Sequence, residues 1–422
     1  MLKKFTILFL FILISASGTI LSNGISLNNI GPRALGMSGA FVAVADDYTA
    51  VYWNPAGCAQ LKGISLGAFV TDLVPMGTYL YDNGTIVVAD AETKANHYIS
   101  PNIAGYLPLM SGDLCLGLGA YVPAGLGAEW DGNELKNLSG GQAYEWNSKI
   151  GVFSITPVIS YKLTSNLYVG AAFNIYYGMM DMARPQLVSQ GVFTQYSEES
   201  TGLGYGFSAG LLFKPIEMLS VGLSFKTQAT VTMEGTAKNP ALAAMNPDLG
   251  ETDFSRDMSW PMWIGGGVAI RPMKGVTIAA DVHYSQWSEA ANELPTDYKE
   301  WKTIPGMDAT KTTLHLNWED AVQIRIGMEY MLDEKLALRL GYYNDPAPAP
   351  DKTLNIAFPN ISYNGFTVGA GYDIGMLTFD IGLEYLIGSE RHIMLADVTQ
   401  HNMPGKHNMN IFSVSFGAGI KL

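Results

Sequence analysis

The chain is poor in charge, in cysteine and in long hydrophobic runs. Only 15% of its 422 residues are charged, against about 25% in average soluble domains. The 38 acidic residues outnumber the 25 basic ones, which argues against nucleic-acid binding because that needs a basic surface. The two cysteines, Cys58 and Cys115, exclude a disulfide-rich scaffold and a cysteine-rich metal site. One bond between them and two free thiols are both open.

The longest hydrophobic run stands at the start of the chain. Lys3 and Lys4 precede the apolar stretch from Phe5 to Ile14, and small residues follow it. This order is typical of a cleaved export signal, so residues 1–17 are predicted to be a signal peptide. A membrane anchor is the weaker interpretation, because a helical span needs about 20 apolar residues.

The remaining hydrophobic residues alternate with small or polar ones. In SVSFGAGIKL, the last ten residues, the apolar side chains fall on every second position, and the others are Ser, Gly or Lys. The same period of two recurs at residues 219–226, 276–285, 322–330 and 377–385, and the apolar face of these segments carries no charge. A soluble β-sandwich also alternates, but its polar face is rarely so rich in glycine. The pattern favours a membrane β-barrel with lipid outside and a lumen inside.

The spacing of the strands supports a transmembrane antiparallel β-barrel, an all-β fold of about 14 strands. Short links such as residues 163–165, 215–217 and 333–334 alternate with long ones such as 124–144, 180–201, 234–259, 289–317 and 345–362. The predicted strands are 63–80, 98–107, 114–123, 145–162, 166–179, 202–214, 218–233, 260–271, 275–288, 318–332, 335–344, 363–373, 376–388 and 408–422.

Residues 18–62 have no place in such a wall. They are too apolar for a disordered tail and too irregular for another strand pair. Since eight strands already enclose a filled interior, a wider barrel can hold a folded segment. The sequence therefore predicts an N-terminal hatch (plug) at 18–62 inside the lumen and a barrel at 63–422. Asn54, Pro55, Ala56 and Gly57 then form a turn where the hatch meets the first strand.

Three stretches carry a resemblance to a known family. SLNNIGPRALGMSGAFVAVADDYTAVYWNPAG, LGLGAYVPAGLGAEWD and NWEDAVQIRIGMEY are similar to the hatch, the third strand and a late strand of the FadL-type outer-membrane transporters. The resemblance implies a monomeric barrel in the outer membrane of a Gram-negative cell. It also implies passive uptake of long-chain fatty acids or other hydrophobic compounds. Extracellular loops would gather the ligand, and an inward bend of the third strand would release it laterally into outer-membrane lipid.

Two further functions remain open beside uptake. One is a FadL-like barrel that serves a secretion system as an accessory or shuttle protein. The other is a simple aqueous porin, which would need an open lumen. No catalytic constellation stands out, and the six histidines have no zinc-like spacing. We therefore expect no enzyme activity, no metal and no cofactor.

Two pairs of residues are candidate sites on the wall and in the loops. Pro123 and Gly125 stand where the third strand should continue, and such residues often mark a bulge. Alternatively, Pro123 ends that strand. Leu242 and Met245 lie in an apolar turn of a long loop that could capture ligand, since exposed apolar patches often mark contact sites. The alternative is packing on neighbouring loops.

Three cations fall on the lumenal positions of predicted strands. Arg325 and Arg339 share their face with Glu329, Asp380 and other acids. They could bind a ligand carboxylate, or they could form an internal charge network that braces the wall against the hatch. Lys226 is more isolated and is therefore the better candidate for a carboxylate partner.

Overall fold

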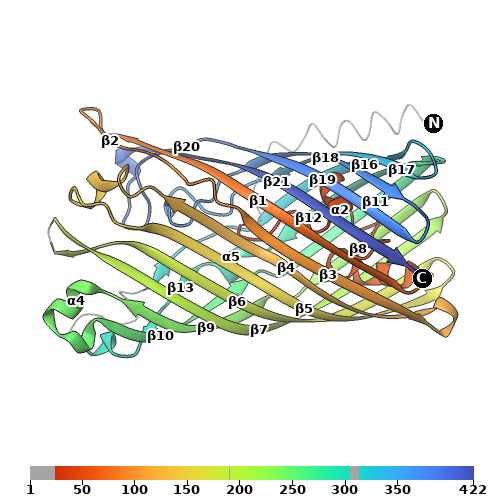
Figure 1. Ribbon diagram of the computed structural model, residues 1–422, viewed down its shortest axis with the longest axis horizontal. Helices are drawn as coiled ribbons and strands as arrows, with labels where there is room; N and C mark the ends of the chain where they lie inside the picture. The colour runs from red at the N-terminus through yellow and green to blue at the C-terminus, as the bar shows by residue number, and fades with distance from the viewer. Residues whose placement is uncertain (1–23, 190, 305–312) are drawn as a thin grey trace.

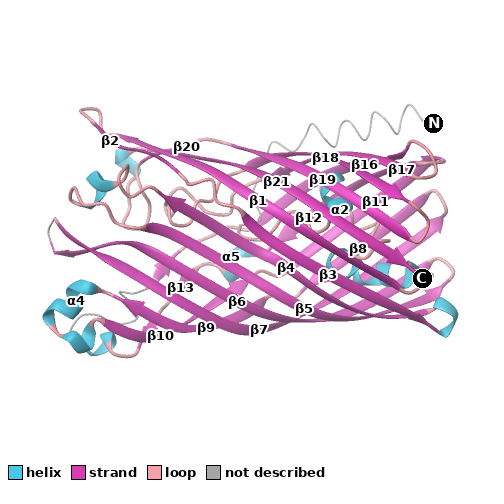
Figure 2. Ribbon diagram, in the orientation of Figure 1, coloured by secondary structure: helices cyan, strands magenta, loops and turns pink. Residues whose placement is uncertain are grey.

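The structure is a computed structural model that describes residues 24–189, 191–304 and 313–422, so the predicted signal peptide at 1–17 lies outside the described residues. One antiparallel sheet closes on itself where β1 (Ser65–Asp82) pairs with β21 (Gly405–Lys421). The result is a closed barrel of 14 strands (Figures 1 and 2). The predicted fold class is thereby confirmed.

Some barrel strands are interrupted, so that the sheet holds more segments than strands. Segments β2 and β3 both pair with β1, and segments β8 and β9 both pair with β7. On the next strand, β10 pairs with β9 and β11 pairs with β8. The other segments are β2 (Val87–Glu92), β3 (Tyr98–Leu109), β4 (Leu114–Trp130), β5 (Trp146–Thr164), β6 (Leu167–Ser189), β7 (Val192–Ile216), β8 (Leu219–Lys226), β9 (Ala229–Lys238), β10 (Glu251–Trp260), β11 (Trp263–Met273), β12 (Val276–Ser285), β14 (Asp297–Tyr298), β16 (Ala321–Met331), β17 (Leu336–Asp345), β18 (Tyr363–Asp373), β19 (Leu377–Gly388) and β20 (Arg391–Ile393).

Short helices occupy the lumen and the loops. They are α2 (Pro32–Gly36), α3 (Ala50–Trp53), α4 (Pro240–Met245), α5 (Trp287–Ala290) and the 3-10 helices η1 (Pro55–Gln60), η2 (Met110–Gly112), η3 (Lys136–Ser139), η4 (Pro247–Leu249), η5 (Trp301–Thr303) and η6 (Leu395–Asp397). A separate pair, β13 (Glu293–Leu294) with β15 (Leu314–His315), lies in a long loop. Within the described ranges no helix has the length and apolar character to cross a membrane.

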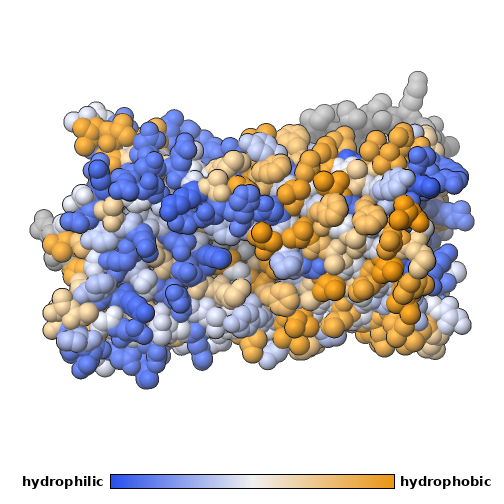
Figure 3. Space-filling model, viewed as in Figure 1, coloured by the Kyte–Doolittle hydropathy of each residue, from blue (hydrophilic) through white to orange (hydrophobic). Residues whose placement is uncertain are grey.

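Two predicted loops are largely strand. Residues 180–201 continue β6 and β7, which stay paired past Asp181 and Glu199, and residues 234–259 are mostly the ends of β9 and β10. The physical reason is that the strands extend beyond the apolar belt, which is the part of the wall whose outer face is covered by apolar side chains. Figure 3 shows apolar side chains over the half with the short turns and polar ones over the half that carries α4. The hydropathy alternation therefore fades while the backbone pairing continues.

The alternation within the belt is as predicted. On β16 the side chain of Ile326 is 40% exposed, whereas that of Arg325 is 1% exposed. On β19 Phe379 faces outward and Asp380 inward. The apolar residues therefore face the lipid and the charged residues face the lumen.

Replacing Ile326 with arginine should lower the free energy of unfolding in lipid by about 2–4 kcal/mol, because it puts a charge on the lipid face near the middle of β16. Glu334→Arg, in an exposed short turn, is the control and should change it by less than about 0.5 kcal/mol. Denaturant titration of the protein in vesicles measures both. Equal costs would mean that Ile326 does not face lipid.

Candidate functional site

Residues 24–62, called the N-terminal segment here, lie inside the barrel against its inner wall (Figure 1). The backbone N–H groups of Phe41 and Val42 donate to the Asp281 carboxylate of β12 at 2.8 and 2.9 Å. A Cβ atom at Gly327 would collide with the carbonyl oxygen of Met37. Glycine on the inner face of the wall is thus what lets the segment's backbone approach so closely.

The predicted turn at 54–57 joins this segment to the wall. Asn54 is fully buried, and its Nδ2 donates to the backbone oxygen of Leu211 on β7 at 3.1 Å. Its Oδ1 accepts from the backbone N–H of Ala56 at 3.1 Å, so that it caps η1, which begins at Pro55. A Cβ atom at Gly57 would collide with a backbone carbonyl of the segment. The four residues therefore form a tight, fully packed junction just before β1.

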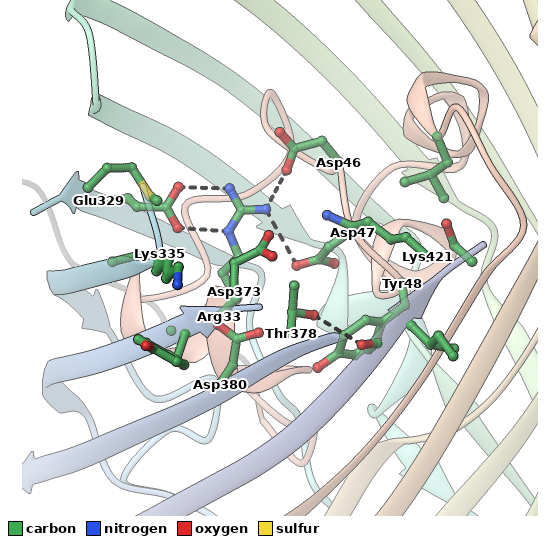
Figure 4. A pocket seen from close by; sticks show the side chains of 18 of the residues that line it. Arg33, Asp46, Asp47, Tyr48, Glu329, Lys335, Asp373, Thr378, Asp380 and Lys421 are labelled. Carbon is green, nitrogen blue, oxygen red and sulfur yellow. Dashed lines mark hydrogen bonds and ion pairs between the residues drawn. The ribbon is translucent and has the colours of Figure 1, made fainter. Parts of the chain in front are cut away.

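A charge network links the segment to three strands at the end of the barrel with the short turns (Figure 4). The Arg33 guanidinium lies 2.5 Å from Asp46 of the segment and 2.8 Å from Glu329 of β16. Arg339 of β17 bridges the same Glu329 at 2.8 Å and Asp380 of β19 at 2.6 Å. Burial would lower the pKa of Arg33, but Asp46 and Glu329 raise it well above its ordinary value. Arg33 thus stays charged and holds the segment.

Arg325 acts on the same segment from β16. Its Nη1 donates to the backbone oxygens of Ser38 at 2.8 Å and Asn28 at 3.0 Å. Its guanidinium carbon lies 4.5 Å from the ring centroid of Tyr343. Arg325 and Arg339 are therefore engaged with protein groups, the geometry that a bracing network requires.

Lys226 has a different environment. Its Nζ lies 3.4 Å from the ring centroid of Tyr52 and 4.7 Å from that of Trp263, and no described residue gives it a hydrogen bond or ion pair. It lines a cavity of about 70 Å³ together with Ser26 and Trp260. The indole N–H of Trp260 is also buried without a partner among the described residues. The cavity therefore brings together two side chains with unused donors.

The backbone pairing between β3 and β4 ends partway along these strands. Their pairing runs from Leu109 and Leu114 to Ile103 and Ala120 and goes no further. Beyond that point β3 continues to pair with β1, while β4 continues to pair with β5 after a register shift that follows Tyr121. The two neighbouring strands thus separate within the wall.

Pro123 and Gly125 lie at this separation. The carbonyl oxygen of Pro123 accepts from the backbone N–H of Leu27 at 2.9 Å, and the N–H of Gly125 donates to the carbonyl oxygen of Ile25 at 2.9 Å. The start of the N-terminal segment therefore takes the place of β3 as the partner of β4. Pro123 does not end the strand, since β4 continues to Trp130.

A cavity of about 620 Å³ occupies the gap. Its lining includes the lumen-facing residues Ser26, Tyr363 and Glu384 and also Ile99 and Met179, whose side chains are exposed on the outer surface. One cavity therefore touches residues of both faces of the wall.

The candidate capture residues are separated by the fold. Both lie on α4, whose N-cap Asn239 accepts from the second and third residues of the helix. Leu242 is 8% exposed and belongs to a buried hydrophobic cluster that includes Phe254 of β10, whereas Met245 is 76% exposed. Only Met245 is open to contact from outside.

Sequence reasoning missed Arg33 and the partners of β4. Arg33 is the one cation of residues 24–61, and its isolation next to Asp46 and Asp47 was the available signal. Cys58 and Cys115 are buried free thiols. Among the described residues, no three His, Cys, Asp or Glu side chains are placed to hold a metal ion.

Comparison with known proteins identifies the family of the chain. A family model described as "Outer membrane protein transport protein (OMPP1/FadL/TodX)" matches residues 13–418. The long-chain fatty acid transport protein of Escherichia coli is 21% identical over 87% of this chain and 88% of its own length. Outer membrane protein P1 of Haemophilus influenzae is 21% identical over 83% and 82%.

Solved structures share the fold. A Pseudomonas aeruginosa FadL homologue aligns with a TM-score of 0.78 and 15% identity over 94% of this chain and 99% of that one. The Pseudomonas putida toluene transporter TodX aligns with a TM-score of 0.73 and 16% identity over 96% and 100%. These relatives are named as transport or outer-membrane proteins, which does not favour the secretion alternative. The chain belongs to the OMPP1/FadL/TodX family of outer-membrane transport proteins.

Proposed function

We propose that this protein is a passive, monomeric channel that takes hydrophobic small molecules into the outer membrane and releases them sideways through its wall. The N-terminal segment acts as the hatch that closes the lumen. The observation that carries the proposal is the cavity of about 620 Å³ between β3 and β4, which is lined by residues of both wall faces.

A route along the barrel axis would require the hatch to move and its contacts with the wall to break. The segment is buried against the wall over most of its length, and Arg33, Arg325 and Arg339 tie it to three strands or brace those strands. Separating buried charges from their partners carries a large desolvation cost. A sideways route through the existing cavity breaks none of these contacts.

We infer that long-chain fatty acids or hydrocarbons are the compounds that enter this cavity. Its volume lies within the range of about 300–1,000 Å³ found for small-molecule sites, and Ile99 and Met179 give it an apolar side. Ser26 lines both this cavity and the smaller one that holds Lys226. A fatty acid whose chain lies in the larger cavity could thus place its carboxylate near Lys226, where a charge-assisted hydrogen bond would form.

Capture from outside is assigned to α4. Met245 projects from the polar end of the barrel, and a flexible thioether side chain suits ligands of varied shape. Leu242 of the same helix is buried in a hydrophobic cluster with residues of β9 and β10 and so holds the helix in place.

Uptake by whole cells tests the proposal. In cells without a fatty-acid channel of their own, this protein should speed the uptake of dodecanoic acid and dodecane but not of a hydrophilic solute such as a disaccharide. Lys226→Met should weaken only the uptake of the acid, by about tenfold, since it removes one charge-assisted hydrogen bond. Faster uptake of the disaccharide would indicate a porin instead.

A further inference from the structure

An acidic residue interrupts the outward face of β1. Val70 and Met76 of this strand are exposed apolar residues, and Asp72 lies between them on the same face because alternate residues of a strand point the same way. Its side chain is 26% exposed. Ionisable residues at membrane depth are expensive and usually functional. Asp72 therefore needs an explanation that packing does not give.

His97 is the partner of Asp72. Its Nδ1 lies 2.6 Å from Asp72 Oδ2, and its side chain is 66% exposed. His97 immediately precedes β3 and lines the wall cavity together with Ile99. The other oxygen of Asp72, Oδ1, is buried and has no partner among the described residues. The pair thus stands at the outer side of the cavity rather than in the lumen.

The segment that carries His97 is fixed to the far side of the opening. Lys94 Nζ lies 2.5 Å from Glu129 of β4, and Asn96 Nδ2 donates to the same carboxylate at 2.7 Å. The backbone N–H of Lys94 also donates to the carbonyl oxygen of Glu129 at 2.8 Å. These bonds bridge β4 and the residues before β3 where the two strands have separated. His97 therefore has a set position at the rim of the gap.

The geometry leaves one ring nitrogen of His97 for a ligand. Asp72 Oδ2 accepts a hydrogen bond from Nδ1–H of His97 and so fixes the ring orientation, and Nε2 has no partner among the residues that the structure describes. Nε2 of a neutral imidazole accepts an O–H, and Nε2 of an imidazolium donates to a carboxylate. A carboxyl group can thus be bound in either of its protonation states.

We propose that His97, oriented by Asp72, binds the carboxyl head group of an amphiphilic ligand as it leaves the wall cavity for the lipid. This inference rests on the proposed lateral release and adds a second polar binding site to the path of the ligand. Lys226 would hold the head group at the inner end of the path, and His97 would hold it at the outer end. Asp72 is a positioning residue, since it acts on the ligand only through His97.

The test compares an acid with the matching hydrocarbon. His97→Phe keeps a ring of similar size and removes both nitrogens, so the uptake of dodecanoic acid should fall about threefold, the effect of one lost hydrogen bond, while dodecane uptake stays unchanged. Asp72→Leu should lower the acid-to-hydrocarbon ratio in the same direction. His392→Phe is the control, because His392 is an exposed histidine of β20 that does not line the cavity.

The outcomes separate this inference from the proposed function. Equal loss of both substrates in His97→Phe, at normal amounts of folded protein in the outer membrane, would make His97 a support of the opening and would overturn the inference. An unchanged ratio in His97→Phe would also overturn it. If the unaltered protein takes up neither substrate, the proposed function itself fails.

Discussion

Deletion of residues 24–50 should convert the closed barrel into an ion-conducting pore. The wall closes through the pairing of β1 with β21, which involves no residue of the N-terminal segment. The deletion removes Arg33 and the backbone groups that Asp281 and Arg325 hold, so polar wall residues would line a lumen wide enough for water. Planar-bilayer conductance should rise at least about tenfold above that of the intact protein.

A deletion elsewhere controls for general damage. Removing residues 240–245, which form α4 between β9 and β10, should leave the conductance at background. Correct insertion of both variants can be checked by heat-dependent mobility on gels. If the barrel without residues 24–50 is inserted and still does not conduct, the N-terminal segment is not the element that closes the lumen.

Filling the wall cavity should have the second large effect. Gly151 of β5 lines the cavity, and a Cβ atom built on it meets only the terminal carbon of Met179 at 3.7 Å. Gly151→Trp can therefore fold, with its indole on the outward face of β5 at the outer side of the cavity. The uptake of both dodecanoic acid and dodecane should fall about tenfold, because the indole has roughly the volume of a ligand segment.

Gly266→Trp is the matched control. Gly266 also lies in a barrel strand, a Cβ atom there has open space around it, and it does not line the cavity. Uptake by this variant should equal that of the unaltered protein. Equal loss in both variants would show that tryptophan harms the barrel in general, and no loss in Gly151→Trp would remove the cavity from the path.

Period-two hydropathy was enough to predict the barrel, because each strand within the belt separates an apolar face from a polar one. It placed Ile326 outside and Arg325 inside correctly. It failed beyond the belt, where the outward faces of β6 and β7 carry polar residues such as Asp181 and Glu199, and where the strands are recognised by their backbone pairing.

The site was less predictable because it depends on partners distant in sequence. Pro123 indicated an irregular strand, but nothing local shows that Leu27 takes over as a backbone partner. The lumenal position of Lys226 followed from the alternation, whereas its contacts with Tyr52 and Trp263 required the folded chain. Asp72 is a polar residue on the outward face and so departs from the alternation. The sequence does not show that its partner is His97, which the folded chain brings to 2.6 Å.

The position of a bound ligand most directly distinguishes lateral release from transport along the barrel axis. A crystal structure of the protein with ω-bromododecanoic acid would locate the heavy atom by its anomalous scattering. If release is lateral, the bromine lies in the wall cavity, near Ile99 and Gly151, with the N-terminal segment in place. A bromine peak between the N-terminal segment and the end of the barrel that carries the short turns would show an axial path and would contradict lateral release.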